Sequence, residues 1–301
     1  MWLYQILQFS FCADGAVMIL SLNSFIRETG IRAVLNRDLL KLSALRYRGF
    51  DGYIASMHQS GNHWIRYVLS TAIARHFGHS DPDHIGDKQY VSAVKTKFGN
   101  SSLPRVVVSH RIYSPLAFNA VTTRCLKFPP YVILVRDLSH MLVSNYERFK
   151  DRYGVPFSTY LRGDVWGRKY NCDIWDSIRF LNAWGDIRQA LPKKTLIVRY
   201  EDMQKDVAHE ARRIWQFFGL PAQGESLLED AARDSSKERM QQKEAAAGKY
   251  GVIIRQSSRN PLDWYSEADQ RYLADVCSRY LKHSFGYDYS AFAGGAVRRA
   301  A

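Results

Sequence analysis

A short polar turn near residue 60 carries residue types that suit anion binding. The turn consists of Ser60, Gly61, Asn62 and His63. It follows an apolar run and leads into a helical pattern that begins at Trp64. A strand, a tight turn with glycine and a helix N-terminus together present backbone N–H groups at the positive end of a helix dipole. The turn lacks the Gly-x-x-x-x-Gly-Lys-Ser/Thr pattern of nucleoside triphosphatases, and a Ser–Gly turn is also common in purely structural roles.

An arginine and a hydroxyl form a second candidate anion site. Arg136 follows the apolar run Tyr131–Val135, and Ser144 comes eight residues later in a helical pattern. An arginine at the carboxyl end of a parallel strand lies at the edge of the sheet where ligands bind. Ser144, about two helical turns on, faces the same side. A guanidinium and a hydroxyl together suit a phosphate, although a salt bridge from Arg136 to Asp137 is the plainer interpretation.

His110 is the candidate for proton transfer. It follows the apolar run that ends at Ser109. An alcohol is a poor nucleophile at neutral pH, and a histidine at a strand end that faces the anion turn can remove its proton. A lone histidine is more often a surface or core residue, so the position after a strand is what favours the catalytic interpretation.

The elements that position these residues alternate along the chain. Strands are expected at Tyr53–Met57, Arg105–Ser109, Tyr131–Val135 and Thr195–Arg199. Helices are expected at Trp64–Phe77, Ser139–Lys150, Asp173–Ala190, Lys205–Phe218 and Ser266–His283. This alternation predicts an α/β single domain with a central parallel sheet flanked by helices and a P-loop-like strand–loop–helix nucleotide site. The polar segment Asp234–Asn260 is expected to be a mobile loop.

Three motifs in the same order resemble the family of sulfotransferases that use 3′-phosphoadenosine 5′-phosphosulfate (PAPS). Met57–Trp64 occupies the place of the family's Tyr-Pro-Lys-Ser-Gly-Thr-Thr-Trp loop. Arg136 and Ser144 reproduce the spacing of its 3′-phosphate motif. The stretch from Leu196 to Met203 is similar to its Arg-Tyr-Glu-Asp-Leu segment. The resemblance extends from residue 52 to residue 289 and implies an enzyme that transfers the sulfuryl group of PAPS to a hydroxyl.

The resemblance also assigns roles to single residues. Ser60, Gly61, Asn62 and His63 would hold the 5′-phosphosulfate, with Trp64 near the adenine. The other assignments are Arg136 and Ser144 for the 3′-phosphate, Tyr200 and Ser235 for the purine, and His110 for the acceptor proton. PAPS would serve as co-substrate, with no metal.

Several positions depart from the family pattern. Gln59 replaces the loop lysine that stabilises the leaving phosphate oxygen, and His58 replaces the proline before it. Because glutamine carries no charge, part of the electrostatic stabilisation is missing, and His58, His63 or an arginine is expected to compensate. The family's last motif survives only in part, with Arg259 and then Arg255 as candidates for the 3′-phosphate.

Composition limits the partners. The 301 residues include 42 Lys and Arg against 29 Asp and Glu, a formal net charge of +13, which favours an anionic partner. The four cysteines are widely spaced without metal-ligand patterns, which indicates reduced thiols in the cytoplasm. No readable nucleic-acid motif is present, so no nucleic-acid partner is expected.

We divide the chain into an amphipathic, basic N-terminal arm at residues 1–50, a sulfotransferase domain at 51–290 and a disordered tail at 291–301. A secretory signal is not expected, and Met18 is an alternative start. The arm favours a helix laid over the core, with peripheral contact to the inner face of the cytoplasmic membrane as the alternative.

The acceptor stays open between a glycan, a lipid-linked molecule and a small molecule, and the oligomeric state is not indicated. Two other functions also remain open. Gln59 favours a catalytically silent PAPS-binding or 3′-phosphoadenosine 5′-phosphate (PAP)-binding protein. The strand–loop–helix also suits a nucleotide kinase, although no lysine fills the usual role on the phosphates.

Overall fold

Five parallel strands form one sheet at the centre of the protein. The computed structural model describes residue 26 and residues 28–96, 102–222, 224, 226–247 and 259–294. The strands are β1 (Gly52–Ser56), β2 (Val91–Ala93), β3 (Val106–Ser109), β4 (Tyr131–Val135) and β5 (Thr195–Arg199). They lie in the order β2-β3-β1-β4-β5, and every neighbouring pair is parallel. The predicted α/β class with a central parallel sheet is confirmed.

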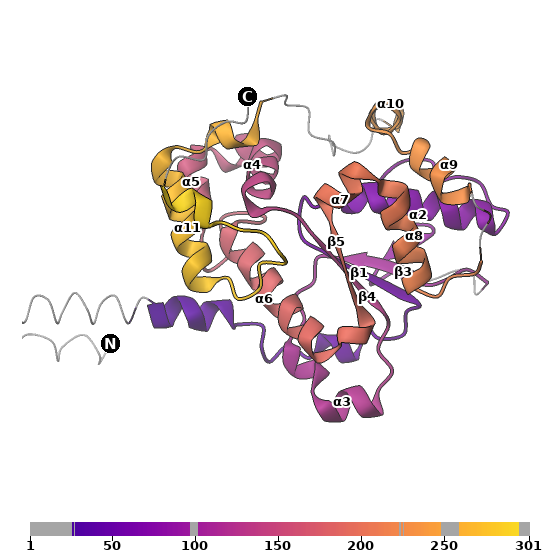
Figure 1. Ribbon diagram of the computed structural model, residues 1–301, viewed down its shortest axis with the longest axis horizontal. Helices are drawn as coiled ribbons and strands as arrows, with labels where there is room; N and C mark the ends of the chain where they lie inside the picture. Colours follow the sequence, from indigo (N-terminus) through magenta and orange to yellow (C-terminus); the bar gives the residue numbers. More distant parts are fainter. Residues whose placement is uncertain are drawn as a thin grey trace, which may run out of the picture.

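Helices cover both faces of this sheet (Figure 1). One group of helices comprises α4 (Leu138–Tyr153), α5 (Phe157–Arg162), α6 (Ile174–Ala190) and α11 (Glu267–Tyr280). The other group comprises α2 (Asn62–His76), α7 (Tyr200–Lys205), α8 (Val207–Phe217) and α9 (Leu227–Arg233). The short helix α3 (Ala120–Cys125) lies apart from both groups at the bottom of the view. A parallel sheet needs this double cover because its strands are apolar on both faces.

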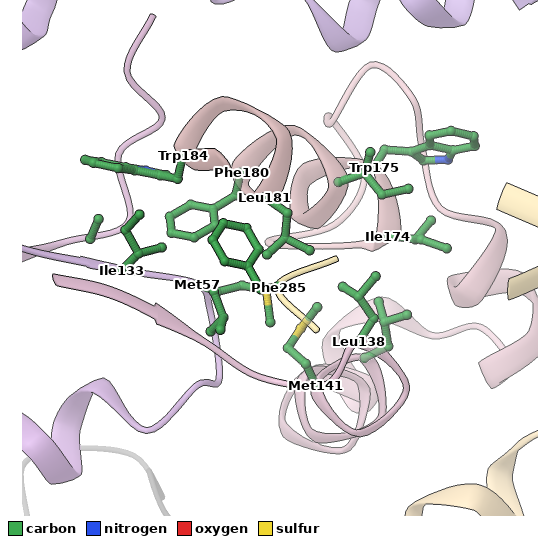
Figure 2. Close-up of a cluster of buried hydrophobic side chains, with 14 of the residues drawn as sticks. Met57, Ile133, Leu138, Met141, Ile174, Trp175, Phe180, Leu181, Trp184 and Phe285 are labelled. Atoms are coloured by element: carbon green, nitrogen blue, oxygen red, sulfur yellow. The ribbon is translucent and has the colours of Figure 1, made fainter. Parts of the chain in front are cut away.

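The strand side chains alternate between two hydrophobic clusters. On β1, Tyr53 and Ala55 belong to the cluster that includes α4 and α6, whereas Ile54 belongs to the cluster that includes α2 and α8. Figure 2 shows part of the first cluster, in which Met57 points toward Phe285 and the side chains of α4 and α6. Met57 is 1% exposed, so the first residue of the polar turn is fixed in the core.

The N-terminal arm packs on the body of the protein where the structure describes it. Residues 28–35 are helical, and Val34 and Ala44 are buried. Asp38 pairs with Arg179 of α6, and both residues are buried. In Figure 1 this helix lies beside the end of α11, where Arg32 stacks on Tyr280 at 5.6 Å. A helix laid over the core therefore describes this part of the arm, while residues 1–25 lie outside the described residues.

Two expectations about order were wrong. The segment expected to be a loop at Asp234–Asn260 contains the helix α10 (Lys237–Ala247), which buries Met240. The tail expected to be disordered from residue 291 begins with the 3-10 helix Ser290–Gly294, in which Phe292 is buried. One apolar side chain of each segment, Met240 or Phe292, is buried in a hydrophobic cluster. Residues 248–258 and 295–301 lie outside the described residues.

Candidate functional site

The predicted site residues follow the carboxyl ends of four adjacent strands. His110 follows β3, the turn at residues 57–61 follows β1, Arg136 follows β4, and Tyr200 follows β5. The strand order reverses at β1, because β3 lies on one side of it and β4 on the other. In open α/β sheets ligands bind at such a switch point. The fold thus brings residues from four separate segments to one edge.

The turn after β1 is shaped for an anion. Gln59 and Gly61 have positive φ angles of 54° and 85°, which turn the chain sharply into α2. Gly61 is the N-cap of α2 and has no side chain to cap the first amides, and no acidic residue lies in the first turn. These amides lie at the N-terminus of a 15-residue helix, which is the positive end of the helix dipole. The turn is a cradle of N–H donors.

The hydroxyl of Ser60 supports this turn. Ser60 is fully buried, and its Oγ donates to the carbonyl of Met57 at 2.6 Å and lies 3.1 Å from Oγ of Ser56. Arg136 Nη1 donates to the carbonyl of Gln59 at 2.8 Å. The two bonds fix the backbone on both sides of the turn. A Cβ on Gly61 would lie 2.8 Å from the ring of Tyr200, so only glycine fits there.

His110 has a defined tautomer. Its Nδ1 lies 2.7 Å from the carbonyl oxygen of Ser56, which can only accept, so Nδ1 carries the hydrogen. In the neutral ring Nε2 then has a lone pair, which accepts from Nδ2 of Asn62 at 3.0 Å. Burial lowers the pKa of His110. A neutral histidine with a lone pair on Nε2 is a ready proton acceptor.

The other two candidate histidines are also held neutral. His58 stacks on His110, with ring centroids 4.0 Å apart. Burial, with a smaller contribution from the charges on His110 and Arg148, lowers the pKa of His58 to about 3. His63 accepts from Nη2 of Arg66 at 3.1 Å, and burial followed by the charge of Arg66 lowers its pKa to about 3.

Arg136 and Ser144 are the two residues predicted to form a second anion site. The guanidinium of Arg136 stacks on the ring of Tyr200 at 4.2 Å. Ser144 on α4 is 6% exposed, and its Oγ has no hydrogen-bond partner among the described residues. A buried hydroxyl without a partner is costly, and a ligand oxygen beside it would supply the missing hydrogen bond.

An aromatic corner lies on the other side of the turn. Trp64 Nε1 donates to Oγ of Ser235 at 3.1 Å. The rings of Trp64 and Tyr200 form an edge-to-face pair with centroids 6.4 Å apart. Ser235 is fully buried and also donates to the carbonyl of Ala232. The corner therefore joins α2, α7 and the segment before α10. It offers flat apolar surfaces with polar edges, which suit a purine.

Arg259 and Arg255 are the remaining residues predicted for the 3′-phosphate. Arg259 is exposed, stacks on Trp264 at 4.2 Å and donates to the carbonyl of Asp263. Trp264 in turn donates to Glu147, three residues after Ser144, so Arg259 lies on the side of α4 that carries Ser144. Arg255 lies outside the described residues.

Sequence reasoning missed two features of this site. Asn62, expected to face a phosphosulfate, turns its amide to His110. Arg66, one helical turn after His63, contacts His63 directly. The i, i+3 spacing on a helix was a signal for the second contact, and no sequence signal indicates the first. Among the described residues, no group of His, Cys, Asp and Glu is arranged to hold a metal ion.

The fold is that of an α/β protein with a parallel sheet, and the candidate anion site lies at the switch point of that sheet. The sulfotransferase domain family matches residues 6–261. The chain therefore belongs to the sulfotransferase family, and the family predicted from its three motifs is confirmed.

Curated relatives agree with this family. A flavonol sulfotransferase-like protein of Flaveria bidentis is 20% identical over 205 residues, which cover 63% of this chain and 64% of that protein. The match thus spans just under two thirds of the plant protein. Sulfotransferase 6B1 of Danio rerio is 22% identical over 268 residues, which cover 82% of this chain and 86% of that protein.

Solved structures share the fold. Mouse sulfotransferase SULT7A1, complexed with PAP, superposes with a TM-score of 0.57 at 17% identity, covering 88% of this chain and 96% of the mouse chain. Retinol dehydratase in complex with androsterone and PAP has a TM-score of 0.53 at 14% identity, covering 83% of this chain and 88% of the other.

Proposed function

We propose that the protein transfers the sulfuryl group of PAPS to a hydroxyl of an acceptor molecule, with His110 as the general base. The observation that carries this proposal is the fixed tautomer of His110 at the sheet edge. Its lone pair on Nε2 lies within the same contact network as the anion cradle, because Asn62 is the first residue of α2. Transfer to an alcohol needs a base that accepts the hydroxyl proton and donors that stabilise the negative charge on the leaving group.

The residues fit PAPS as co-substrate. Backbone amides at the start of α2 face the 5′-phosphosulfate, and Ser144 with Arg136 takes the 3′-phosphate. The hydroxyl of Ser144, which has no hydrogen-bond partner within the described part of the chain, supports the second assignment. Trp64, Tyr200 and Ser235 supply the purine corner. Arg259 stays a candidate for the 3′-phosphate because it lies against Trp264 beside α4.

Proton transfer and charge stabilisation are divided between two elements. His110 Nε2 accepts the proton of the acceptor hydroxyl, whose oxygen forms a bond to sulfur. The bond between sulfur and the phosphate oxygen breaks, and its electron pair stays on that oxygen, giving PAP. The α2 amides stabilise the charge that develops there. Asn62 must release Nε2 before an acceptor hydroxyl binds, so its amide is free to turn to a sulfuryl oxygen.

The acceptor carries a hydroxyl, and we propose a glycan, a lipid-linked molecule or a small molecule. The names of relatives mention flavonol, retinol and androsterone, which favour a flat small molecule. Exposed Trp166, in the loop after α5, is an aromatic surface that suits either a sugar ring or a flat ring system.

We also propose a cytoplasmic location with peripheral membrane contact at the inner face. Three described cysteines, Cys125, Cys172 and Cys277, are free thiols. The arm exposes Leu39, Leu40 and Leu42, the second of them 84% exposed. Among the described residues, no helix is long and apolar enough to cross a bilayer.

Two measurements test the sulfotransferase proposal. Calorimetry should show one PAP site, and Arg136→Ala should weaken it by about 2–3 kcal/mol, the loss of a charged phosphate partner. Sulfur-labelled PAPS with a fractionated host extract should identify the labelled acceptor. With that acceptor, His110→Ala should lower turnover about 100-fold or more while PAP affinity stays intact. The exposed His209→Ala on α8 is the control.

The second candidate is a silent PAPS- or PAP-binding protein, which Gln59 favours because the loop has no lysine. It requires the same PAP affinity and no labelled product from any fraction. PAP affinity that survives Arg136→Ala would contradict the assignment of Arg136 to the 3′-phosphate, which both candidates share.

A further inference from the structure

Arg66 is a charged side chain buried in α2, one turn beyond the anion cradle. The residue is 4% exposed. Its Nη2 donates to the carbonyl of Ile85 at 2.9 Å and to Nδ1 of His63 at 3.1 Å. Both partners are neutral groups, so neither compensates the positive charge.

The charge of Arg66 has no carboxylate partner among the described residues. Its Nε has no hydrogen-bond partner there either. The acidic residue that acts on it, Asp87, does so electrostatically without an ion pair within the part of the chain described. Arg179, buried to a similar depth, forms ion pairs with both Asp38 and Asp176. Burial lowers the pKa of Arg66 to about 10.

A buried charge without a counter-charge is expensive to maintain, and an anion that binds nearby offsets the cost. The neighbouring turn is built for an anion, yet it carries Gln59 where a cation would be expected. The amides of that turn begin the same helix that carries Arg66. The buried cation of Arg66 therefore lies on the helix that directly follows Gln59, the position where the family has a lysine.

We propose that Arg66 is a positioning residue that supplies the fixed positive charge which Gln59 lacks, and that it orients His63 beside the bound phosphosulfate. This inference rests on the proposed sulfotransferase function. Arg66 lies behind His63 and acts on the ligand through its charge and through that ring. The phosphosulfate then provides the counter-charge that no carboxylate among the described residues supplies.

The contact with Arg66 also fixes which ring nitrogen of His63 carries the hydrogen. A guanidinium can only donate, so Nδ1 of His63 accepts and its ring carries the hydrogen on Nε2. The charge of Arg66 adds to burial in lowering the pKa of both His63 and His110. Arg148 of α4 acts on His63 in the same direction, and so does His110. His63 and His110 thus stay neutral at pH 7.

Two further titratable groups among the described residues, His58 and Asp87, act on members of this set. His58 covers the ring of His110 from the turn after β1. Asp87, from the segment between α2 and β2, favours the charged form of Arg66. Neither removes the net positive charge at Arg66, because His58 has its pKa lowered to about 3 and Asp87 is not in an ion pair with it.

Histidine titration in the ligand-free protein tests the proposal directly. Arg66→Met removes the charge and keeps the apolar stem, whereas Arg66→Lys keeps a charge. We expect NMR to show the pKa of His63 and His110 rising by about one unit or more in Arg66→Met and staying low in Arg66→Lys. Arg124→Met, at an exposed position on α3, removes one charge elsewhere and should leave both values unchanged.

Binding of PAP gives the second readout. Calorimetry should show about tenfold weaker PAP binding for Arg66→Met, near-parental affinity for Arg66→Lys and parental affinity for Arg124→Met. Should Arg66→Met fail to fold, Arg66→Gln replaces it in the same comparison. Parental histidine pKa values together with parental PAP affinity in the uncharged variant would overturn the proposal. A protein that binds PAP but sulfates no acceptor would contradict the proposed function and leave these two readouts in place.

Discussion

The imidazole of His58 lies stacked on that of His110, with ring centroids 4.0 Å apart and planes 15° from parallel. The stack covers one face of the proposed base, while Ser56 and Asn62 hold its two nitrogens. Water is thereby excluded from the ring, and the uncharged form is favoured. His58 occupies the place of the family's proline, so the stack is a feature of this chain.

The stack predicts a particular pH dependence. The base must be unprotonated, so a lowered pKa of His110 moves the acidic loss of kcat/KM to below its ordinary pKa of 6.5. His58→Ala admits water to the ring and should shift this loss to higher pH, whereas His58→Phe keeps the cover and should leave it in place. A pH–rate series on the three proteins measures the shift. Identical profiles would mean that His58 has no part in setting the state of His110.

Ser144→Ala should affect stability and binding in opposite ways. The substitution removes a buried hydroxyl that has no partner among the residues that the structure describes, so Tm without PAP should stay the same or rise. PAP affinity should fall about tenfold because a phosphate hydrogen bond is lost. Thermal melting with and without PAP, together with calorimetry, gives both quantities.

Ser177→Ala is the matched control for that change. Ser177 on α6 is also buried, but its Oγ donates to the carbonyl of Asp173 at 2.7 Å. Its removal should lower Tm and leave PAP affinity unchanged. If Ser144→Ala behaved like Ser177→Ala, Ser144 would be a structural residue and the 3′-phosphate assignment would be wrong.

The N-terminal arm predicts salt-dependent binding to anionic vesicles. Leu40 is 84% exposed, and Lys41 beside it has a side chain 66% exposed, which suits a shallow contact with an anionic lipid surface. Sedimentation with phosphatidylserine vesicles should be weakened by Leu40→Ser and by salt, and phosphatidylcholine vesicles should bind little. Val121→Ser on α3 alters another exposed apolar side chain and should have no effect. Equal sedimentation of all three proteins would contradict membrane contact by the arm.

The sheet was predictable because four of its five strands contain a run of at least three apolar residues. β4 and β5 have the predicted bounds, Tyr131–Val135 and Thr195–Arg199. β2 was missed because three residues, Val91–Ala93, are too few for a periodic signal. Helix α10 was missed because its sequence is polar, and its order depends on tertiary contacts such as that of Lys243 over Tyr67 at 4.9 Å.

The positions of the candidate site along the chain were predictable, whereas the orientations of its side chains were not. Loop positions after strands follow from the sheet order, and the structure places His110 and Arg136 at the same edge. Rotamers depend on packing between distant segments, so the bond from Asn62 to His110 has no signal in the sequence. Arg66 contradicts the usual expectation that arginine is exposed, and its depth only becomes visible in the folded protein.

Gln59→Lys brings the two proposals about charge together. The side chain of residue 59 changes, but the backbone carbonyl that accepts from Arg136 does not, so the turn should keep its shape. A lysine there adds a cation where negative charge develops on the leaving phosphate oxygen, so turnover should be kept or raised. In the Arg66→Met background the same change should restore at least part of the lost PAP affinity and turnover, because one cation replaces another. A double-mutant cycle measures this coupling. Strictly additive effects would mean that Arg66 and position 59 act independently, and a Gln59→Lys enzyme without activity would place the needed charge elsewhere.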